Sequence, residues 1–295
     1  MKYSNPVIIM GMHRSGTTMV TEMLNKLGLF VGRDLEKNCE SWFFISMNEW
    51  LLKQSGAGWH NPQAVTYLLN NDKVESLAAE YATCRLNGLS IAKYVGWKKF
   101  LNKEIPSGGM NSPWGWKDPR NTYTLGFWLK LFPNARIINI YRNGVPVAAS
   151  LRERDVKGLD RFTKKHLTRK KLGLYNLFAK KGGFVNSVRC LELRGGFSLW
   201  EEYVIKGMEQ VMACQGNVID IKYEDFVDEP EKHMRVLADF CGLNFSEQQL
   251  QDVCADVQPE KASSYCNNDE LVDFYKTVKS NKTMIKLGYS EPKSI

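Results

Sequence analysis

Short apolar runs alternate along this chain with stripes of apolar residues at helical spacing. Val7-Ile8-Ile9-Met10 is such a run, too short for a helix and typical of a buried strand. After a glycine-bounded turn, apolar residues recur at helical spacing from Met19 to Leu27, and Gly28 follows as a helix stop. The same reasoning predicts three further strands, at residues 114–117, 136–141 and 218–223.

Helical stripes separate these predicted strands. Strands that alternate with helices form right-handed βαβ units, which build a mainly parallel sheet with helices on both faces. We therefore expect an α/β fold in a single domain over residues 1–295, although the length also permits two small domains. The helices are predicted at 40–52, at 71–89, between 119 and 133, from 145 onward, at 199–214 and at 230–241, and residues 90–113 give mixed signals.

The turn after the first strand carries a modified phosphate-binding motif. Gly11 and Gly16 have the P-loop spacing G-x-x-x-x-G-K-[ST], and Thr18 holds the Ser/Thr position. Thr17 stands where the lysine belongs, so the motif argues against triphosphate hydrolysis but not against binding a smaller anion. Strand, turn and helix together favour a P-loop-type anion site, since helix N-termini attract anions, with an ordinary tight turn as the alternative.

The cysteine, histidine and hydropathy patterns further limit the class of protein to which this chain can belong. The seven cysteines show no CxxC spacing and the four histidines are scattered, so we expect reduced thiols and no metal site. No segment is long or apolar enough to span a membrane. The first strand begins at residue 7, which leaves no room for a secretory leader, and we expect a cytoplasmic protein.

The net charge of +8 is concentrated in one segment. Residues 152–194 contain 13 Lys/Arg and 4 Asp/Glu, a balance of +9, which leaves the remainder at −1. Such a segment indicates an anionic partner nearby and not a nucleic-acid coat, although a solvated lysine-rich insertion explains it equally well. We expect a basic insertion at about 155–197 that is divided by glycines at 158, 173, 182–183 and 195–196.

Four polar or aromatic side chains follow the ends of different predicted strands. These are Arg14, Lys117, Arg142 and Tyr223. Ligands of parallel α/β sheets bind beyond the carboxyl ends of the strands, so we expect these side chains around one crevice.

The same residues carry a family resemblance. The chain resembles sulfotransferases that use 3′-phosphoadenosine 5′-phosphosulfate (PAPS), above all the bacterial-type members related to tyrosylprotein sulfotransferases. Four motifs in the right order carry it: GMHRSGTT at 11–18, WGWKDPR at 114–120, YRNGVPVAASLRERD at 141–155 and IKYEDFVDEPEKHMRVLADFCGL at 221–243.

The resemblance implies how PAPS would be held. It places the loop around the 5′-phosphosulfate and assigns Arg142 and Ser150 to the 3′-phosphate; a guanidinium and a hydroxyl suit a phosphate dianion. Tyr223 matches a residue near the adenine, with an ordinary strand-end tyrosine as the alternative. PAPS needs no metal, so the resemblance implies PAPS as co-substrate and no metal ion. The loop residues are Arg14, Ser15, Gly16, Thr17 and Thr18.

The resemblance also implies catalytic roles. Lys117 matches the family's catalytic lysine, and Arg14 would support the same leaving oxygen. The catalytic histidine of cytosolic members would fall at Pro119, so the base must come from elsewhere. Glu40 is our candidate, since the bacterial-type and tyrosylprotein-type relatives place a glutamate before this helix; a surface glutamate at a helix N-terminus is the alternative.

Two other functional classes stay open. One is a P-loop kinase, and the other is a non-catalytic nucleotide- or polyanion-binding module that uses the basic segment. For the sulfotransferase, we expect the acceptor group to be a hydroxyl or amine of a small molecule, glycan, lipid or peptide, and the basic segment would suit an anionic one. We expect no nucleic-acid partner.

Overall fold

A computed structural model describes residues 5–107, 109–180, 182–214 and 216–291. The chain divides into two compact units, and each is described by itself. Unit 1 comprises Met1–Arg142 and Tyr203–Ala262, and unit 2 comprises Asn143–Glu202 and Ser263–Ile295.

Unit 1 is built on a four-stranded parallel sheet in the order β2-β1-β3-β4. Ile9 of β1 lies opposite Lys117 of β2 and Ile138 of β3, so the carboxyl ends of these strands meet at one edge of the sheet. This confirms the expected α/β class with its parallel sheet. The strands are β1 (Val7–Gly11), β2 (Gly115–Lys117), β3 (Arg136–Tyr141) and β4 (Val218–Lys222).

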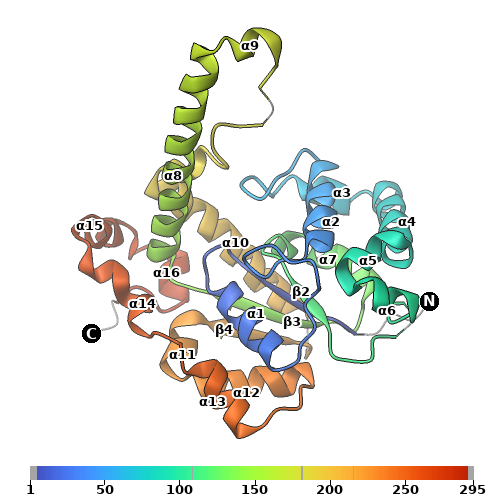
Figure 1. Cartoon of the computed structure of the whole chain (residues 1–295). Helices are drawn as coiled ribbons and strands as arrows, with labels where there is room; N and C mark the ends of the chain where they lie inside the picture. Colours follow the sequence, from blue (N-terminus) through green and yellow to red (C-terminus); the bar gives the residue numbers. More distant parts are fainter. Residues whose placement is uncertain (1–4, 108, 181, 215, 292–295) are drawn as a thin grey trace. The chain divides into compact units, whose positions relative to one another are not determined.

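Helices cover both faces of the sheet because successive strand side chains point to opposite sides (Figure 1). Ile9 belongs to the core that includes residues of α1 (Thr17–Lys26) and α12 (Pro230–Cys241). Ile8 belongs to the opposite core, with residues of α2 (Trp42–Lys53) and α7 (Asn121–Leu131).

An aromatic stack ties α2 to the sheet. Phe44 of α2 lies flat on Trp116 of β2, with ring centroids 3.9 Å apart and planes 2° from parallel. Trp128 of α7 meets both rings edge-on. Aromatic pairs of this kind add to the free energy of area burial, so α2 is anchored beside the end of β2.

Unit 1 contains further helices, and most of them apart from α4 are short. Residues 90–113, whose sequence pattern is mixed, contain single-turn helices that no long apolar stripe would reveal. Ser246 and Gln249 form a capping box at the start of α13. The elements are α3 (Val65–Leu69), α4 (Asp72–Asn87), η1 (Leu89–Ile91), α5 (Ala92–Val95), α6 (Trp97–Leu101), α11 (Tyr223–Asp228), α13 (Glu247–Cys254) and α14 (Glu260–Ser263).

Unit 2 is helical among its described residues. The Asn143 side chain accepts a hydrogen bond from Val145 N at 2.9 Å and caps α8. Arg152 of α8 pairs with Glu270 of α15, with Nη2 2.6 Å from Oε2. The elements are α8 (Gly144–Lys171), α9 (Leu174–Leu177), η2 (Arg189–Leu191), the first part of α10 (Leu193–Ala213), η3 (Ser264–Asn267), α15 (Asp269–Val278) and α16 (Lys282–Lys286).

Three glycines expected to divide the basic segment lie inside helices, so that expectation was wrong for them. Gly158 is a buried residue within α8, which runs on to Lys171. Gly195 and Gly196 lie within α10, which begins six residues before the predicted start at 199. A Cβ on Gly195 would meet the Arg189 carbonyl oxygen at 1.9 Å. Close packing therefore requires a glycine here, which outweighs its low helix propensity.

Candidate active site

The turn from β1 to α1 depends on residues with positive φ. Gly11 has φ 138°, and a Cβ there would lie 2.1 Å from the Ile140 carbonyl oxygen on β3. Arg14 is exposed with φ 72°, unusual for a residue with a side chain, and Gly16 has φ 91° directly before α1. The loop therefore leads into the positive end of α1, the geometry of an anion site.

Tyr223 lies between the loop and Arg142. A Cβ on Gly16 would meet Tyr223 Cδ2 at 2.3 Å, so the ring packs directly on the loop backbone. The guanidinium carbon of Arg142 lies 4.4 Å from the centre of the Tyr223 ring, a cation–π arrangement. Burial raises the pKa of the Tyr223 hydroxyl, while Arg142 lowers it. The structure thus brings Gly16, Tyr223 and Arg142 together.

Lys117 connects α1, the helix that follows the loop, with Glu40. Its Nζ donates to Glu40 Oε1 at 2.7 Å, to the Asn38 carbonyl oxygen at 3.0 Å and to Thr18 Oγ1 at 3.2 Å. The residue is 2% exposed. Its ion-pair partner is therefore Glu40, and not the adjacent Asp118.

Glu40 directly precedes the N-cap residue of α2 and is buried. It is 7% exposed, so the surface glutamate considered as an alternative is ruled out. Burial raises the pKa of its carboxyl and so does Asp118, whereas Lys117 and Arg120 lower it. The backbone that carries it is tightly turned, since Glu36 N donates to the Glu40 carbonyl oxygen at 2.8 Å.

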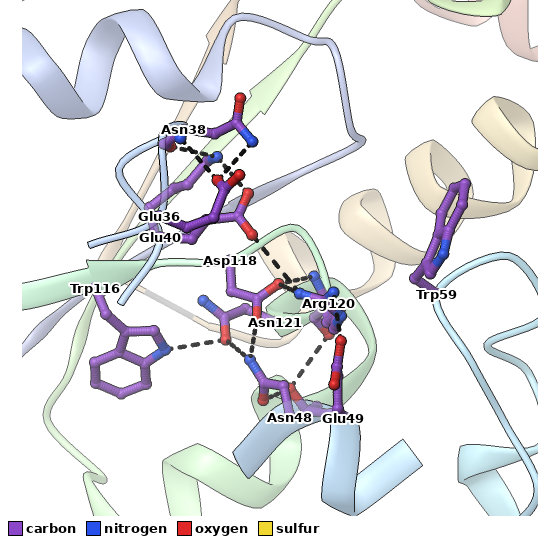
Figure 2. A network of polar contacts seen from close by, with 12 residues as sticks. Glu36, Asn38, Glu40, Asn48, Glu49, Trp59, Trp116, Asp118, Arg120 and Asn121 are labelled. Atoms are coloured by element: carbon purple, nitrogen blue, oxygen red, sulfur yellow. Dashed lines mark hydrogen bonds and ion pairs between the residues drawn. The ribbon is translucent and has the colours of Figure 1, made fainter. Parts of the chain in front are cut away.

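A second cation, Arg120, approaches the other oxygen of Glu40. Its Nη1 lies 3.7 Å from Glu40 Oε2 and 3.0 Å from Asp118 Oδ1, and its Nη2 lies 3.2 Å from Glu49 Oε1. Figure 2 shows Glu40, Asp118 and Glu49 arranged around this guanidinium. Burial disfavours the charge of Arg120, but the three carboxylates outweigh it and raise its pKa. Glu40 thus lies between the cations of Lys117 and Arg120. Asp118 and Glu49 also pair with Arg120 and offset its charge.

A buried network of hydrogen-bonded amide side chains holds Asp118 in place (Figure 2). Asn48 of α2 donates to Asp118 Oδ2 at 2.8 Å and to Asn121 Oδ1 at 2.9 Å. Its own Oδ1 accepts from Thr124 Oγ1 and Trp128 Nε1, each at 2.8 Å. Asn48 therefore has partners for its amide nitrogen and its oxygen, and it fixes Asp118 against α2 and α7.

Aromatic rings surround the loop histidine. His13 meets Trp59 with ring centroids 5.0 Å apart and Tyr203 at 6.1 Å. The Tyr203 hydroxyl donates to the Trp59 carbonyl oxygen at 2.8 Å. Phe43 and Phe44 of α2 are core residues, whereas Trp59 contacts the loop through His13.

The structure places the predicted site residues in three groups. Thr18, Lys117 and Glu40 form one hydrogen-bonded chain, and Gly16, Tyr223 and Arg142 form a stack. Buried Ser15 and Thr17 and exposed Arg14 lie on or beside the loop. Ser150 lies on α8 in unit 2, so its predicted partnership with Arg142 of unit 1 stays a prediction.

Two residues of the network were missed from the sequence. Arg120 was not among the predicted site residues, because its approach to Glu40 depends on a segment distant in the chain. Asn48 was not considered. The signal for Asn48 was a polar residue on an otherwise apolar stripe of α2, between buried Phe44 and Leu51.

Comparisons with known proteins identify the family. A family model described as the sulfotransferase family matches residues 6–247. The chain therefore belongs to the sulfotransferase family, a family of transferases. A search of curated proteins found no match.

Solved structures similar to this chain include bacterial sulfotransferases. A sulfotransferase domain from the curacin biosynthetic pathway is 14% identical, covering 94% of this chain and 98% of that chain, with a TM-score of 0.48. A sulfotransferase from Alicyclobacillus acidocaldarius is 14% identical, covering 96% and 95%, with a TM-score of 0.46. A sulfotransferase domain from the Synechococcus PCC 7002 olefin synthase is 16% identical, covering 95% and 96%, with a TM-score of 0.46.

The described part of the chain contains neither a candidate metal site nor a candidate membrane-spanning helix. No cluster of three or more His, Cys, Asp or Glu residues suited to hold a metal ion occurs there. Within the same residues, no helix combines the length and apolar character needed to cross a membrane.

Proposed function

We propose that this protein transfers a sulfuryl group from PAPS to a hydroxyl or amine of an acceptor. The observation that carries the proposal is the Thr18–Lys117–Glu40 chain beside the loop. It links a hydroxyl of the first turn of α1, a buried cation and a buried carboxylate within hydrogen-bond distance. Family membership supports sulfuryl transfer in general.

The loop residues fit a phosphosulfate group better than a triphosphate. Thr17 replaces the lysine that would reach a γ-phosphate, and the nearby ammonium is Lys117, donating to Thr18. The Ser15 hydroxyl is buried and has no hydrogen-bond partner among the described residues. An anion in the loop would offer this hydroxyl an acceptor, which fits the expected loop of Arg14, Ser15, Gly16, Thr17 and Thr18.

Arg142 and Tyr223 are proposed to hold the nucleoside part of PAPS. Arg142 would bind the 3′-phosphate, since a planar guanidinium suits a phosphate dianion, and its stacking on Tyr223 orients it. Tyr223 would pack near the adenine and keep the loop in shape through its contact with Gly16. Ser150 remains a predicted partner for the same phosphate.

The proposed roles in catalysis follow from the contacts of Glu40 and Lys117. Bound PAPS would supply the sulfuryl group and a phosphate leaving group. Glu40 would remove the acceptor's proton as the new bond to sulfur forms, which requires its ionised state. Lys117, with Arg14, would neutralise the charge that collects on the departing phosphate oxygen. Arg120 and Asp118 would keep the carboxylate of Glu40 in place.

A labelled-sulfate transfer screen tests the proposal. The purified chain is incubated with PAPS carrying labelled sulfate and with sugars, lipids, phenols or tyrosine peptides, with and without Mg²⁺. We expect transfer to at least one acceptor class in the absence of Mg²⁺. Magnesium-dependent ATP turnover without sulfate transfer would indicate a kinase instead. Heparin binding without transfer would indicate a non-catalytic module.

A further inference from the structure

Helix α8 is packed over only its first part. Its buried residues run from Gly144 to Gly158, and none of the residues from Leu159 to Phe178, all of which the structure describes, is buried. Figure 1 shows α9 at the end of α8. Gly173, with φ 63°, makes the turn between the two helices. This end of α8 therefore owes little of its stability to a core.

Residues 172–179 form an apolar tip at this end, with the sequence LGLYNLFA. Three of its large side chains face solvent: Leu172 is 65% exposed, Leu177 is 73% exposed and Phe178 is 70% exposed. Scattered exposed apolar residues are ordinary on proteins, but a run of them at one turn marks an interaction surface.

Cations flank the apolar tip on both sides. Arg169, Lys170 and Lys171 precede it and Lys180 follows it. The sequence from Arg161 to Lys181 contains no Asp or Glu. Leu167, 57% exposed, shares a helix face with Lys164, Lys170 and Lys171 through i±3 and i+4 spacing. We call Lys164, Arg169, Lys170, Lys171 and Lys180 the cationic collar.

The base of the tip is held by side-chain contacts. His166 Nδ1 lies 3.1 Å from the Tyr175 hydroxyl, and the His166 ring meets Phe184 edge-on with centroids 5.4 Å apart. Lys180 Nζ lies 4.3 Å from the centre of the Phe184 ring. These contacts engage Tyr175 and Phe184, whereas Leu172, Leu177 and Phe178 are each at least 65% exposed.

We propose that the apolar tip and the cationic collar dock this protein on an anionic lipid bilayer. Lys and Arg side chains are attracted to anionic headgroups, and leucine and phenylalanine gain by leaving water for the acyl boundary. A nucleic acid or a sulfated glycan would use the cations but would leave Leu172, Leu177 and Phe178 in water. The apolar tip therefore favours the bilayer over a soluble polyanion. The proposal is independent of sulfuryl transfer.

Vesicle sedimentation with the full chain tests the proposal. Vesicles of phosphatidylcholine alone are compared with vesicles of phosphatidylcholine and phosphatidylglycerol at two salt concentrations. We expect at least tenfold stronger binding to the anionic vesicles, weakening as salt screens the cationic collar. The variant Leu172→Ser/Leu177→Ser/Phe178→Ser should bind the anionic vesicles at least tenfold more weakly than the natural chain. Replacing Lys170 and Lys171 by Glu should have a similar effect.

A matched variant separates the tip from exposed apolar side chains in general. Leu77, Leu89 and Leu101 of unit 1 are 67%, 69% and 74% exposed, and their triple change to Ser should leave vesicle binding unchanged. Far-ultraviolet circular dichroism melting checks that all variants fold. Equal binding to neutral and anionic vesicles, or equal binding by the tip and control variants, would overturn the proposal. So would loss of heparin binding in the Lys170/Lys171 variant while vesicle binding persists, which would indicate a soluble polyanion.

Discussion

Lys117 donates a hydrogen bond to Glu40 across 2.7 Å, although 77 positions separate the two residues in the chain. The end of β2 delivers the lysine, and the turn before α2 delivers the glutamate. Both side chains are withdrawn from water, so each depends on the other for its charge. This pair is the centre of the proposed chemistry, and the first prediction concerns it.

Replacing Glu40 with Gln should abolish most of the turnover while leaving donor binding intact. Glutamine keeps an oxygen that can accept from Lys117 but cannot take a proton, so we expect kcat to fall about 10²- to 10⁴-fold. Turnover assays with labelled PAPS measure kcat, and calorimetry with 3′-phosphoadenosine 5′-phosphate (PAP) measures binding. Glu22→Gln, at an exposed position on α1, is the control. Normal turnover in the Glu40 variant would exclude this residue as the base.

Replacing Arg120 with Gln should move the acid limb of the activity profile to higher pH. Burial raises the pKa of the Glu40 carboxyl, and Arg120 lowers it, so removing Arg120 raises that pKa further. Activity is lost as pH falls through the pKa of a base, and the loss should therefore begin at a higher pH. The pH dependence of kcat/KM measures this, with Arg85→Gln as control. If the acid limb stays in place or moves to lower pH, then Glu40 is not the base whose pKa Arg120 lowers.

Replacing Gly16 with Ala should weaken PAP binding by about tenfold or more, a loss of at least about 1.4 kcal/mol. The new Cβ would lie 2.3 Å from the Tyr223 ring, so either the loop backbone or the tyrosine ring must move. Gly28→Ala is a close control, since Gly28 also has positive φ, at 109°, but a Cβ there meets nothing within 4 Å. Equal binding losses in the two variants would show that backbone strain, and not the Tyr223 contact, matters.

Replacing Arg142 with Ala should weaken binding of PAP far more than binding of adenosine 5′-phosphate. The two nucleotides differ by the 3′-phosphate, and a charge-assisted hydrogen bond contributes about 1.5–3 kcal/mol, so we expect roughly a 10- to 100-fold selective loss. Titration calorimetry with both nucleotides measures the difference. Equal losses for the two ligands would show that Arg142 acts through Tyr223 and the loop, and not on the 3′-phosphate.

Replacing Asn48 with Leu should destabilise the fold. The change removes the acceptor of the Trp128 indole and Thr124 hydroxyl and a donor to Asp118, all in a buried environment. Buried polar groups left without partners cost about 1–3 kcal/mol each, so we expect a loss of about 3 kcal/mol in the free energy of unfolding. Urea denaturation measures it. Asn25→Leu, at an exposed position, should change stability by less than about 0.5 kcal/mol, and a similar small change at Asn48 would contradict the network's importance.

The arrangement of strands, loop and helices could be predicted because it rests on short-range patterns. The apolar run from Val7 and the glycines at 11 and 16 predicted β1 and the turn, and the structure shows both. The basic segment was harder. Gly158 looked like a break, but it is a buried residue within α8, and a Cβ there would meet nothing within 4 Å, so the helix continues through it.

The sequence by itself determined the class of this protein, since the α/β alternation and the motifs from Gly11, Trp114 and Tyr141 are local patterns. It also placed Lys117 at the end of a predicted strand, whereas it named Glu40 only through resemblance to a family. The tertiary structure decided that Lys117 pairs with Glu40, that Arg120 approaches the same carboxylate and that Asn48 supports Asp118. These contacts join residues about 70 to 80 positions apart, and only the packing of α2 on β2 and α7 places them within hydrogen-bond distance.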